Sequence, residues 1–240
     1  MTTLFISDLH LDDARPEASR LFEQFVEEEA LQAQALYILG DLFEYWIGDD
    51  MSTETSKRVI AALSSLNEAG IPCYLMHGNR DFLLGPDFAA QCGLSLLPET
   101  VVIDLHGTQT LLLHGDSLCT DDTVYQQIRL KVRSAQWQSW FLSQTPDERV
   151  AFVLSAREES RDHQSNLSMD IMDVNQGAVC RAFEQHDVST MIHGHTHRLA
   201  IHEHATGNGA AKRIVLGDWY QSGSLVRAGT DGLSLEPYPT

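Results

Sequence analysis

The chain of 240 residues has few cysteines and few basic residues, and each shortage excludes whole classes of protein. The four cysteines, Cys73, Cys92, Cys119 and Cys180, are scattered and form no CxxC pair. We therefore expect neither a disulfide framework nor a structural zinc site. Sixteen Lys and Arg residues stand against 34 Asp and Glu residues, so the formal net charge is -18. Such a charge repels polyanions, and no nucleic-acid partner is expected.

Long apolar runs are also missing. No run reaches the roughly 18–20 residues that a membrane-spanning helix needs. The N-terminal stretch MTTLFISDLH begins a strand pattern at once and lacks the charged region that marks a signal peptide. A cytoplasmic location is the resulting expectation. Hydrophobic residues still make up 43% of the chain, which is enough for a globular protein with one sizeable core.

Apolar segments typical of strands alternate with segments of helical spacing in the first third of the chain. The expected strands are 2–7, 35–40 and 71–76, and the expected helices between them are 21–34 and 57–70. This alternation predicts an α/β fold with a parallel sheet.

The rest of the chain changes its pattern twice. Residues 100–105 and 108–114 predict a hairpin, and the residues from about 121 to 182 have a helical pattern without strands. Strand patterns return at 188–194, and the segments LAIHEHA, KRIVLG and GSLVRA predict antiparallel strands between glycine-rich turns. We therefore expect a single domain over residues 1–240 with a helical insertion at about 121–182.

Side chains that bind metal ions follow five of the predicted strands, in the motifs DLH, GD, HGN, HGD and HGHTH. The carboxyl ends of parallel strands meet in one crevice, and Asp8 and His10 face one centre if the chain stays extended there. Glycines within these motifs allow the backbones to pack closely. Carboxylates and imidazoles together suit manganese, iron or zinc. Asp41 can bridge two such ions at a separation of about 3.5–4 Å.

The ordered set DLH, GDLFE, HGNRD, LHGD and HGHTH resembles the calcineurin-like binuclear metallophosphoesterases over nearly the whole chain. The resemblance implies an α/β sandwich of mixed sheets flanked by helices. It also implies two ion sites that share Asp41 as a bridge. Asp8, His10, Asp41 and His197 would hold one ion, and Asp41, Asn79, His114 and His195 would hold the other.

The residue after Asn79 is Arg80, where many members of this family have a His that protonates the leaving group. An arginine, with a pKa above about 12, cannot give up a proton usefully, but it can clamp a phosphate through paired hydrogen bonds. We infer a reaction whose leaving group is already a stabilised anion, as in the cleavage of a phosphoanhydride. The alternative is a structural salt bridge from Arg80 to Asp81 or Glu44.

Other polar residues near these motifs have less direct interpretations. His77 stands beside the site but points away from it, and His193 is expected to face inward behind the HxH pair. Asp81 and Asp116 are candidates for carboxylates that orient imidazoles. Three further histidines are expected at the surface: His106, His202 and His204.

The segment 125–144 mixes Arg and Lys with Trp137, Trp140, Phe141 and Leu142. Around it, residues 121–170 contain six basic against eight acidic residues, so this part of an acidic chain is nearly neutral. One interpretation is an amphipathic helix pair that packs on the core. The other is a lid with an apolar face and a basic rim, suited to an amphiphilic anionic substrate.

Longer strings, ALYILGDLFEYWIGDD, HGNRDFLLG, LLHGDSLCTDD, IMDVNQGAV and IHGHTHR, resemble family members that cleave UDP-2,3-diacylglucosamine in the lipid A biosynthesis of Gram-negative bacteria. This resemblance implies a hydrolase in which water attacks the UMP-side phosphorus and releases UMP and 2,3-diacylglucosamine 1-phosphate. It implies two Mn²⁺ ions per chain, a lid that holds the acyl chains, and peripheral attachment to the anionic cytoplasmic face of the inner membrane.

The same resemblance assigns catalytic roles to Asn79, Arg80 and His195. It assigns substrate contacts to Asn79, Arg80, Asp122, Ser160, Gln164, Leu167 and His195. At Gln164 and Leu167 the chain departs from relatives that carry Asn and Lys. The missing Lys puts one phosphate or headgroup contact in doubt, and Arg157 or Arg161 are candidates to replace it.

Two alternatives stay open at this point. The same motifs suit another nucleotide pyrophosphatase or a phosphoprotein phosphatase, because a fold does not define a function. A chain that binds ions without catalysis is the alternative outside enzymes, and the complete set of candidate ligands argues against it. We expect the protein to be a monomer.

Overall fold

The computed structural model describes residues 2–165 and 173–239, and the side chains of residues 2–160 and 173–239. Short runs of buried apolar residues form parallel strands in the first sheet, whose order is β11-β10-β1-β2-β3-β4. The pair β10 and β11 is antiparallel and adds to the β1 edge. The bounds are β1 (Thr3–Ile6), β2 (Ala35–Ile38), β3 (Cys73–Leu75), β4 (Ser95–Leu96), β10 (Gly223–Gly229) and β11 (Gly232–Tyr238).

A second sheet has the order β5-β6-β7-β9-β8. Its centre is parallel, since β7 pairs in parallel with β6 and β9, whereas β5 and β8 are antiparallel edge strands. The bounds are β5 (Thr100–Leu105), β6 (Thr108–Leu113), β7 (Thr190–His193), β8 (Ala200–Thr206) and β9 (Gly209–Val215).

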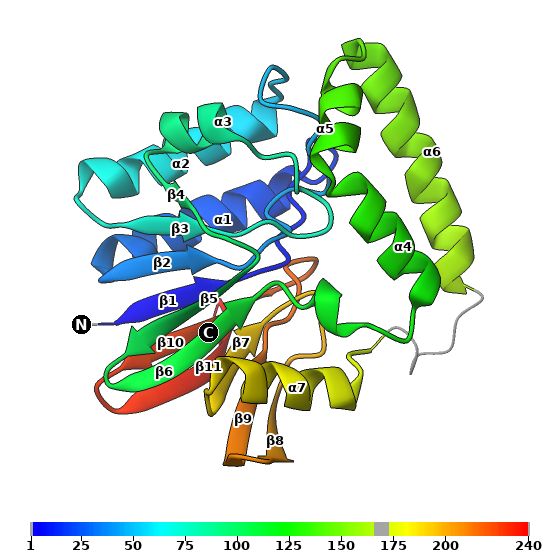
Figure 1. Ribbon diagram of the computed structural model, residues 1–240. Helices are drawn as coiled ribbons and strands as arrows, with labels where there is room; N and C mark the ends of the chain where they lie inside the picture. The colour runs from blue at the N-terminus through cyan, green and yellow to red at the C-terminus, as the bar shows by residue number, and fades with distance from the viewer. Residues whose placement is uncertain (1, 166–172, 240) are drawn as a thin grey trace.

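The two sheets pack on each other with helices outside both (Figure 1). A buried cluster that includes Phe5 and Val226 of the first sheet and Leu112 and Ile192 of the second fills the space between them. Helices α1 (Pro16–Glu28), α2 (Glu54–Glu68) and α3 (Pro86–Cys92) cover the outer face of the first sheet. Helix α7 (Gln176–His186) covers the second. The chain is thus an α/β sandwich with mixed sheets, as predicted.

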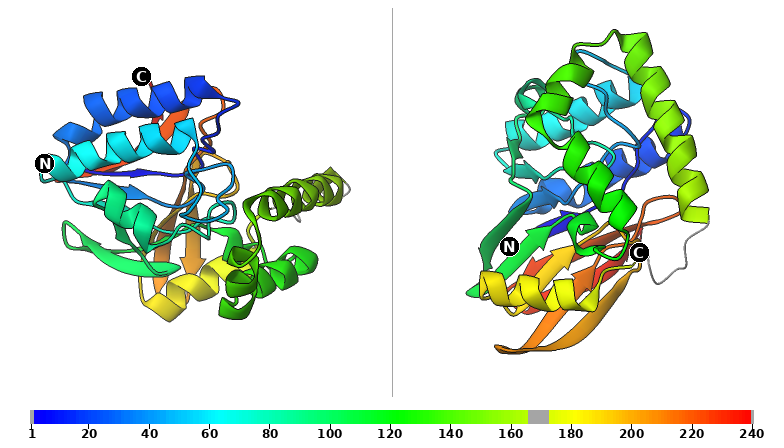
Figure 2. Two further views of the ribbon diagram at one scale, coloured as in Figure 1. Left: turned by 90° about the horizontal axis from the view of Figure 1, so that it is seen from above. Right: turned by 45° about the vertical axis from the view of Figure 1, so that its right-hand side comes forward.

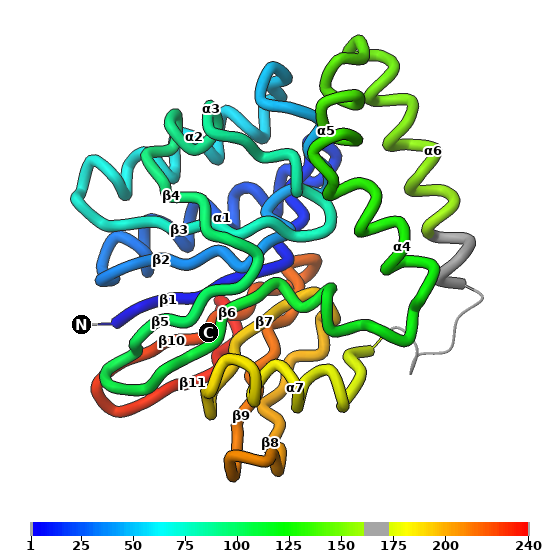
Figure 3. Tube along the Cα trace, in the orientation of Figure 1, coloured from blue at the N-terminus to red at the C-terminus, as the bar shows by residue number. Residues whose placement is uncertain are grey.

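Three further helices stand beyond the carboxyl ends of β1, β2 and β3 (Figures 1 and 2). They are α4 (Thr123–Val132), α5 (Ala135–Leu142) and α6 (Pro146–Ser165). Figure 3 traces this part of the chain between β6 and α7. Phe141 of α5 is fully buried and belongs to the core cluster under α1 to α3, so α5 is packed on the sandwich. No helix within the described residues combines the length and the apolar composition of a membrane-spanning segment.

Several predicted boundaries differ from the structure for local reasons. The helix expected at 21–34 spans α1 instead, because Pro16 favours the first helical turn and a 3-10 turn, η1 (Ala30–Gln32), precedes β2. The helix expected at 57–70 begins earlier, at Glu54, where the Thr53 side chain accepts a hydrogen bond from the Ser56 amide.

The late strands are antiparallel as predicted, but β10 lies in the other sheet. Strands β8 and β9 pair as expected, but β10 leaves their sheet and pairs with β1, at the other side of the sandwich. Alternation of apolar and polar residues reports which side chains are buried, not which strand lies next to them. The parallel prediction holds for β1 to β4, whereas each sheet as a whole is mixed.

Candidate metal centre

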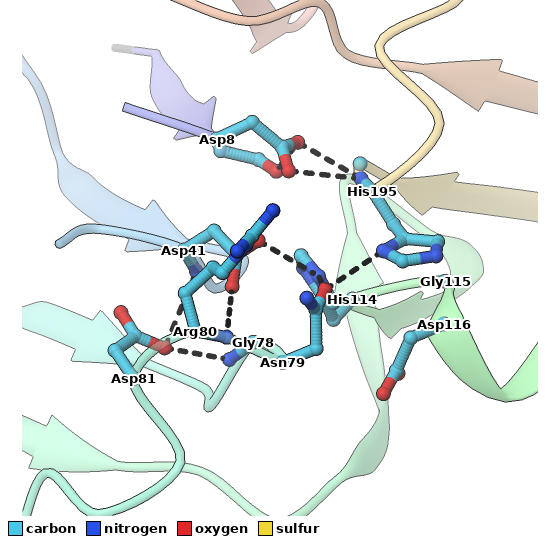
Figure 4. Close-up of polar contacts among 12 residues, drawn as sticks. Asp8, Asp41, Gly78, Asn79, Arg80, Asp81, His114, Gly115, Asp116 and His195 are labelled. Atoms are coloured by element: carbon cyan, nitrogen blue, oxygen red, sulfur yellow. Dashed lines mark hydrogen bonds and ion pairs between the residues drawn. The ribbon is translucent and has the colours of Figure 1, made fainter. Parts of the chain in front are cut away.

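The side chains that follow β1, β2, β3, β6 and β7 meet at one end of the sandwich. Figure 4 shows Asp8, Asp41, Asn79, His114 and His195 pointing toward one another from these separate loops. Strands of both sheets contribute, so the cluster lies where the two sheets end together, on the side where α4 to α6 stand.

One group of donors consists of Asp8, His10 and His197, whose ligand atoms lie within 4.8 Å of one another. Asp8 Oδ1 lies 3.3 Å from His197 Nε2 and 4.0 Å from His10 Nε2. The two Nε2 atoms are 3.2 Å apart. Ligand atoms of a single ion bound at about 2.0–2.2 Å are separated by roughly 3–3.5 Å, so these spacings suit one ion.

A second group consists of Asp8, Asp41 and His114, again within 4.8 Å. Asp41 Oδ2 lies 3.6 Å from His114 Nε2 and 3.9 Å from His10 Nε2, so one oxygen stands between the two groups. Asp41 Oδ1 accepts a hydrogen bond of 2.8 Å from the Arg80 amide, which fixes the direction of Oδ2. This is the arrangement that a bridging carboxylate needs.

Asn79 and His195 extend the second group. Asn79 Oδ1 lies 3.0 Å from His114 Nε2 and 2.9 Å from His195 Nδ1. The backbone N–H of His195 donates to both oxygens of Asp8, at 3.1 and 2.9 Å. All seven predicted ligands therefore lie in one continuous cluster.

The backbone is left-handed at five of the seven predicted ligands. Asp8, His10, Asp41, His195 and His197 have φ between 51° and 68°, and in the described chain only His106 and Asp187 share this property among non-glycine residues. Such conformations cost free energy and concentrate at functional sites. Asp8 and His10 do face one centre, but not through an extended chain: β1 ends at Ile6, and the left-handed turns direct both side chains inward.

Each of three imidazoles has an oxygen atom within 3.2 Å of Nδ1 and directs Nε2 into the cluster. His10 Nδ1 lies 3.2 Å from Glu44 Oε2, His197 Nδ1 lies 3.2 Å from Asp218 Oδ2, and His114 Nδ1 lies 2.8 Å from the carbonyl oxygen of Leu39. A proton on Nδ1 leaves a lone pair on Nε2. The Nε2 lone pairs of His10 and His197 then face each other and cannot form a hydrogen bond, whereas a shared cation binds both. The donor set therefore fits metal ions.

Burial and neighbouring charges shift the pKa values of the cluster in both directions, and nearby carboxylates raise those of His114 and His197 against the effect of burial. Burial raises the pKa of the Asp41 carboxyl against the opposing effect of His114 and His10. Burial alone would raise the pKa of Asp8, but its hydrogen bond with His197 and the nearby His114 lower it. Burial and then His114 lower the pKa of His195 to about 3, so this imidazole is neutral at pH 7, as metal binding requires.

Two glycines make the close approach of these loops possible. A Cβ atom on Gly78 would lie 2.0 Å from Asp41 Oδ1, and one on Gly194 would lie 2.1 Å from Asp8 Oδ2. Any side chain at either position would displace a candidate ligand.

Asp81 and Asp116 have partners other than the imidazoles that were expected. Asp81 is fully buried and accepts backbone N–H groups of Leu42 at 2.7 Å and Gly78 at 2.9 Å, which joins the loops after β2 and β3. Asp116 accepts the Tyr125 hydroxyl at 2.9 Å and Arg129 Nε at 2.7 Å, which joins α4 to the loop after β6.

The remaining histidines follow the predictions in part. His77 binds the Leu84 carbonyl oxygen at 2.7 Å, away from the cluster, and His193 is fully buried behind it. His106 is exposed in a turn. His202 and His204 are half-buried, in contrast to the prediction, because His204 Nε2 accepts a hydrogen bond of 3.2 Å from Arg213.

Arg80 has no ion pair with a described carboxylate, so the predicted alternative of a salt bridge to Asp81 or Glu44 is not found. Its side chain is half-buried, and its Nε atom is buried without a hydrogen-bond partner in the described part of the chain. Arg80 thus stands beside Asp41, with its Nε donor unused in the described part of the chain (Figure 4).

The other predicted substrate contacts lie on the α4 and α6 side. Asp122 caps α4 by accepting the Tyr125 amide at 2.9 Å, and Ser160 is exposed on α6. Gln164 belongs to α6, but its side chain lies outside the described residues, as do Leu167 and the side chain of Arg161.

Most of the basic side chains predicted to form the rim of the lid bind groups of the sandwich instead. Arg133 donates to the Gly78 carbonyl oxygen at 2.9 Å, and Arg149 to that of Ile47 at 2.6 Å. Arg129 pairs with Asp116, and Arg157 with Glu44. These arginines attach the helices to the core, and Lys131 is exposed.

Two residues of the site, Asp218 and Tyr125, were not singled out from the sequence, and Glu44 was named only as a possible partner of Arg80. Glu44 and Asp218 face imidazoles, and Tyr125 stacks on His195 with ring centroids 6.1 Å apart. The sequence does contain a signal for Asp218: the strand KRIVLG is followed by Asp in the same way as the strand before Asp41. Nothing local distinguishes Glu44 or Tyr125.

Residues 1–199 match the calcineurin-like phosphoesterase family, and the chain belongs to this family. A protein of Stenotrophomonas maltophilia (strain K279a) named UDP-2,3-diacylglucosamine hydrolase is 51% identical to the chain, over 98% of each. Proteins of the same name from Serratia proteamaculans (strain 568) and Yersinia pseudotuberculosis (serotype O:1b, strain IP 31758) are 48% and 50% identical over the full length of both chains.

The Asp81 contacts predict a loss of stability in the variant Asp81→Asn. An amide nitrogen cannot accept the backbone N–H groups that one carboxylate oxygen now binds, so the free energy of unfolding should fall by about 1–3 kcal/mol. Urea denaturation measures it. Asp87→Asn, at an exposed position of α3, is the matched control and should change it by less than about 0.5 kcal/mol. Equal losses in both variants would contradict the account.

Proposed function

We propose that the protein hydrolyses the pyrophosphate of UDP-2,3-diacylglucosamine to UMP and 2,3-diacylglucosamine 1-phosphate. The observation that carries the proposal is the identity of about 50% over the full chain to hydrolases named for this substrate. The cluster of carboxylates and imidazoles supports it, because it offers two groups of donors, and Asp41 Oδ2 lies 3.9 Å from His10 Nε2 in one and 3.6 Å from His114 Nε2 in the other.

The proposed cofactor is a pair of Mn²⁺ ions. Asp8, His10 and His197 would hold one ion, Asn79, His114 and His195 the other, and Asp41 both. Hard carboxylate oxygens together with imidazoles suit this metal. When bound, such ions supply an activated water and offset the negative charge on the phosphorus under attack.

Arg80 and Asn79 are proposed to orient the substrate pyrophosphate. The free donors of Arg80 suit a non-bridging phosphate oxygen. The contact between Asn79 and His195 holds together the two loops that carry them. The expelled group is a sugar 1-phosphate, whose negative charge is already stabilised. A residue that cannot donate a proton is therefore compatible with this reaction.

The helices α4 to α6 are proposed as a lid that holds the acyl chains, within a single domain spanning residues 1–240. Large apolar side chains of these helices are exposed near the site: Val124, Ile128, Leu130, Trp140, Leu142, Phe152 and Leu154. Asp122, Ser160, Gln164 and Leu167 are proposed to contact the substrate on this side. All candidate ligands come from one chain, which suits a monomer.

The same exposed side chains support a proposed peripheral location at the cytoplasmic face of the inner membrane. Insertion of these apolar groups at the membrane surface would offset the repulsion of an acidic chain from anionic lipid. Co-sedimentation with vesicles of zwitterionic and anionic lipid tests it. Binding should fall when Ile128 and Leu130 are both changed to Ser, and binding that is unchanged by these substitutions would contradict the proposal.

The direct test of the function is release of UMP from UDP-2,3-diacylglucosamine by the protein with Mn²⁺. In water enriched in oxygen-18 the label should enter UMP, and a chelator should abolish turnover. An analogue without acyl groups should react far more slowly, since the lid could not bind it. Absence of UMP release would contradict the proposed function. Equal turnover of UDP-2,3-diacylglucosamine and of the analogue without acyl groups would favour a general nucleotide pyrophosphatase. Faster release of phosphate from a phosphopeptide would favour a protein phosphatase.

The variant Arg80→Ala should lower kcat roughly 100-fold or more, because a fixed positive charge at the phosphate is lost. Its Mn²⁺ content and its unfolding temperature should match those of the wild-type protein, since Arg80 makes no ion pair with a described residue. Arg20→Ala, at an exposed position of α1, is the matched control. Full activity in Arg80→Ala, or loss of its bound ions, would refute the proposed role of Arg80 in binding the pyrophosphate.

A further inference from the structure

We propose that the loop Gly217–Tyr220 positions the donor group Asp8, His10 and His197, with Asp218 and Tyr220 as its positioning residues. The loop follows β9 and lies beyond residues 1–199, the part of the chain that matches the family. The inference rests on the proposed ion at this donor group and goes further, because it assigns the orientation of all three donors to one short segment.

The loop is anchored at its base and in its middle. Ser224 of β10 accepts a hydrogen bond of 2.8 Å from the Gly217 amide and donates one of 3.2 Å to the Gly217 carbonyl oxygen. Trp219 is buried, and its ring lies edge-on to Phe25 with centroids 5.5 Å apart. An anchored loop can hold other groups in place.

Asp218 fixes His197 and the loop together. Its Oδ2 lies 3.2 Å from His197 Nδ1, and its Oδ1 accepts the Tyr220 amide at 3.1 Å. With both oxygens engaged, the carboxylate cannot rotate freely. It therefore selects the His197 tautomer that carries a proton on Nδ1 and directs the Nε2 lone pair toward Asp8.

Tyr220 fixes the plane of His10. The two rings are parallel within 5°, with centroids 5.3 Å apart. The Arg15 guanidinium carbon lies 4.4 Å from the Tyr220 ring centre, and Arg15 also donates a hydrogen bond to the His10 carbonyl oxygen. The stack and this hydrogen bond restrain a ligand whose backbone is in the left-handed region.

Asp8 receives the third contact. The Trp219 amide donates to the Asp8 carbonyl oxygen at 3.1 Å, so the anchored Trp219 restrains the backbone of the remaining donor. Among the described residues, the loop Gly217–Tyr220 thus contacts every member of one donor group and makes no hydrogen bond, ion pair or ring contact with Asn79, His114 or His195. A loss of this loop's contacts should therefore weaken one ion and spare the other.

The test titrates metal-free protein with Mn²⁺ and follows free and bound Mn²⁺ by electron paramagnetic resonance. The wild-type protein should bind two ions that give a spin-coupled spectrum. In Asp218→Asn one ion should bind about 10–100-fold more weakly, as expected for a partner of a metal-binding His. The other ion should keep its affinity, and the spectrum at one equivalent should be that of an isolated Mn²⁺.

Further variants separate positioning from folding. Tyr220→Ala should weaken the same ion, and Tyr220→Phe, which keeps the stack, should restore wild-type binding. Asp231→Asn, in an exposed turn, is the matched control for Asp218→Asn. The unfolding temperature of each metal-free variant is measured in parallel.

Wild-type affinity for both ions in Asp218→Asn and Tyr220→Ala would overturn the inference. Equal weakening of both ions together with a lower unfolding temperature would also overturn it, because the loop would then act on the fold as a whole. A wild-type protein that binds fewer than two ions would refute the proposed metal centre itself. That result appears before any variant is compared, so the two failures are distinguishable.

Discussion

The carboxylate of Asp41 lies buried beside a second buried carboxylate, Asp8, and this unfavourable pair constrains the whole end of the sandwich. Two anions removed from water cost free energy unless they receive hydrogen bonds or opposite charge. Backbone amides of Arg80 and His195 donate to them, and imidazoles close in from both sheets. Left-handed turns and close-packed glycines follow from the need to bring these groups within ion-binding distance.

The helices α4 to α6 depend on the same site. Their arginines bind carboxylates and carbonyl oxygens that belong to the ligand-bearing loops, as Arg133 does at Gly78 and Arg157 does at Glu44. Glu44 in turn faces His10, so one carboxylate links α6 to a candidate ligand. This attachment explains why arginines gather in this part of an acidic chain. The apolar side chains of these helices that stay exposed, such as Ile128 and Leu130, are those proposed to meet a substrate or a membrane.

Sequence patterns predicted a parallel α/β core with candidate ligands at one edge, because strand ends such as those before Asp8 and Asp41 are local signals and parallel strands end together. The sandwich and the full set of seven ligands came from the family resemblance. The patterns could not predict how Asp8 and His10 turn inward, since the left-handed turn depends on contacts with distant loops. Glu44 and the partner of β10 were missed for the same reason: what they touch is set by packing between segments far apart in the chain. Asp218 had a local signal, a strand followed by Gly and Asp, that went unused.

The central claim is that Asp41 is shared between two ions. Anomalous diffraction at the manganese edge, from crystals grown with Mn²⁺, tests it most directly. The account predicts two peaks, one among Asp8, His10 and His197 and one among Asn79, His114 and His195, with the Asp41 carboxylate in contact with both. A single peak, or two peaks of which Asp41 contacts only one, would contradict it.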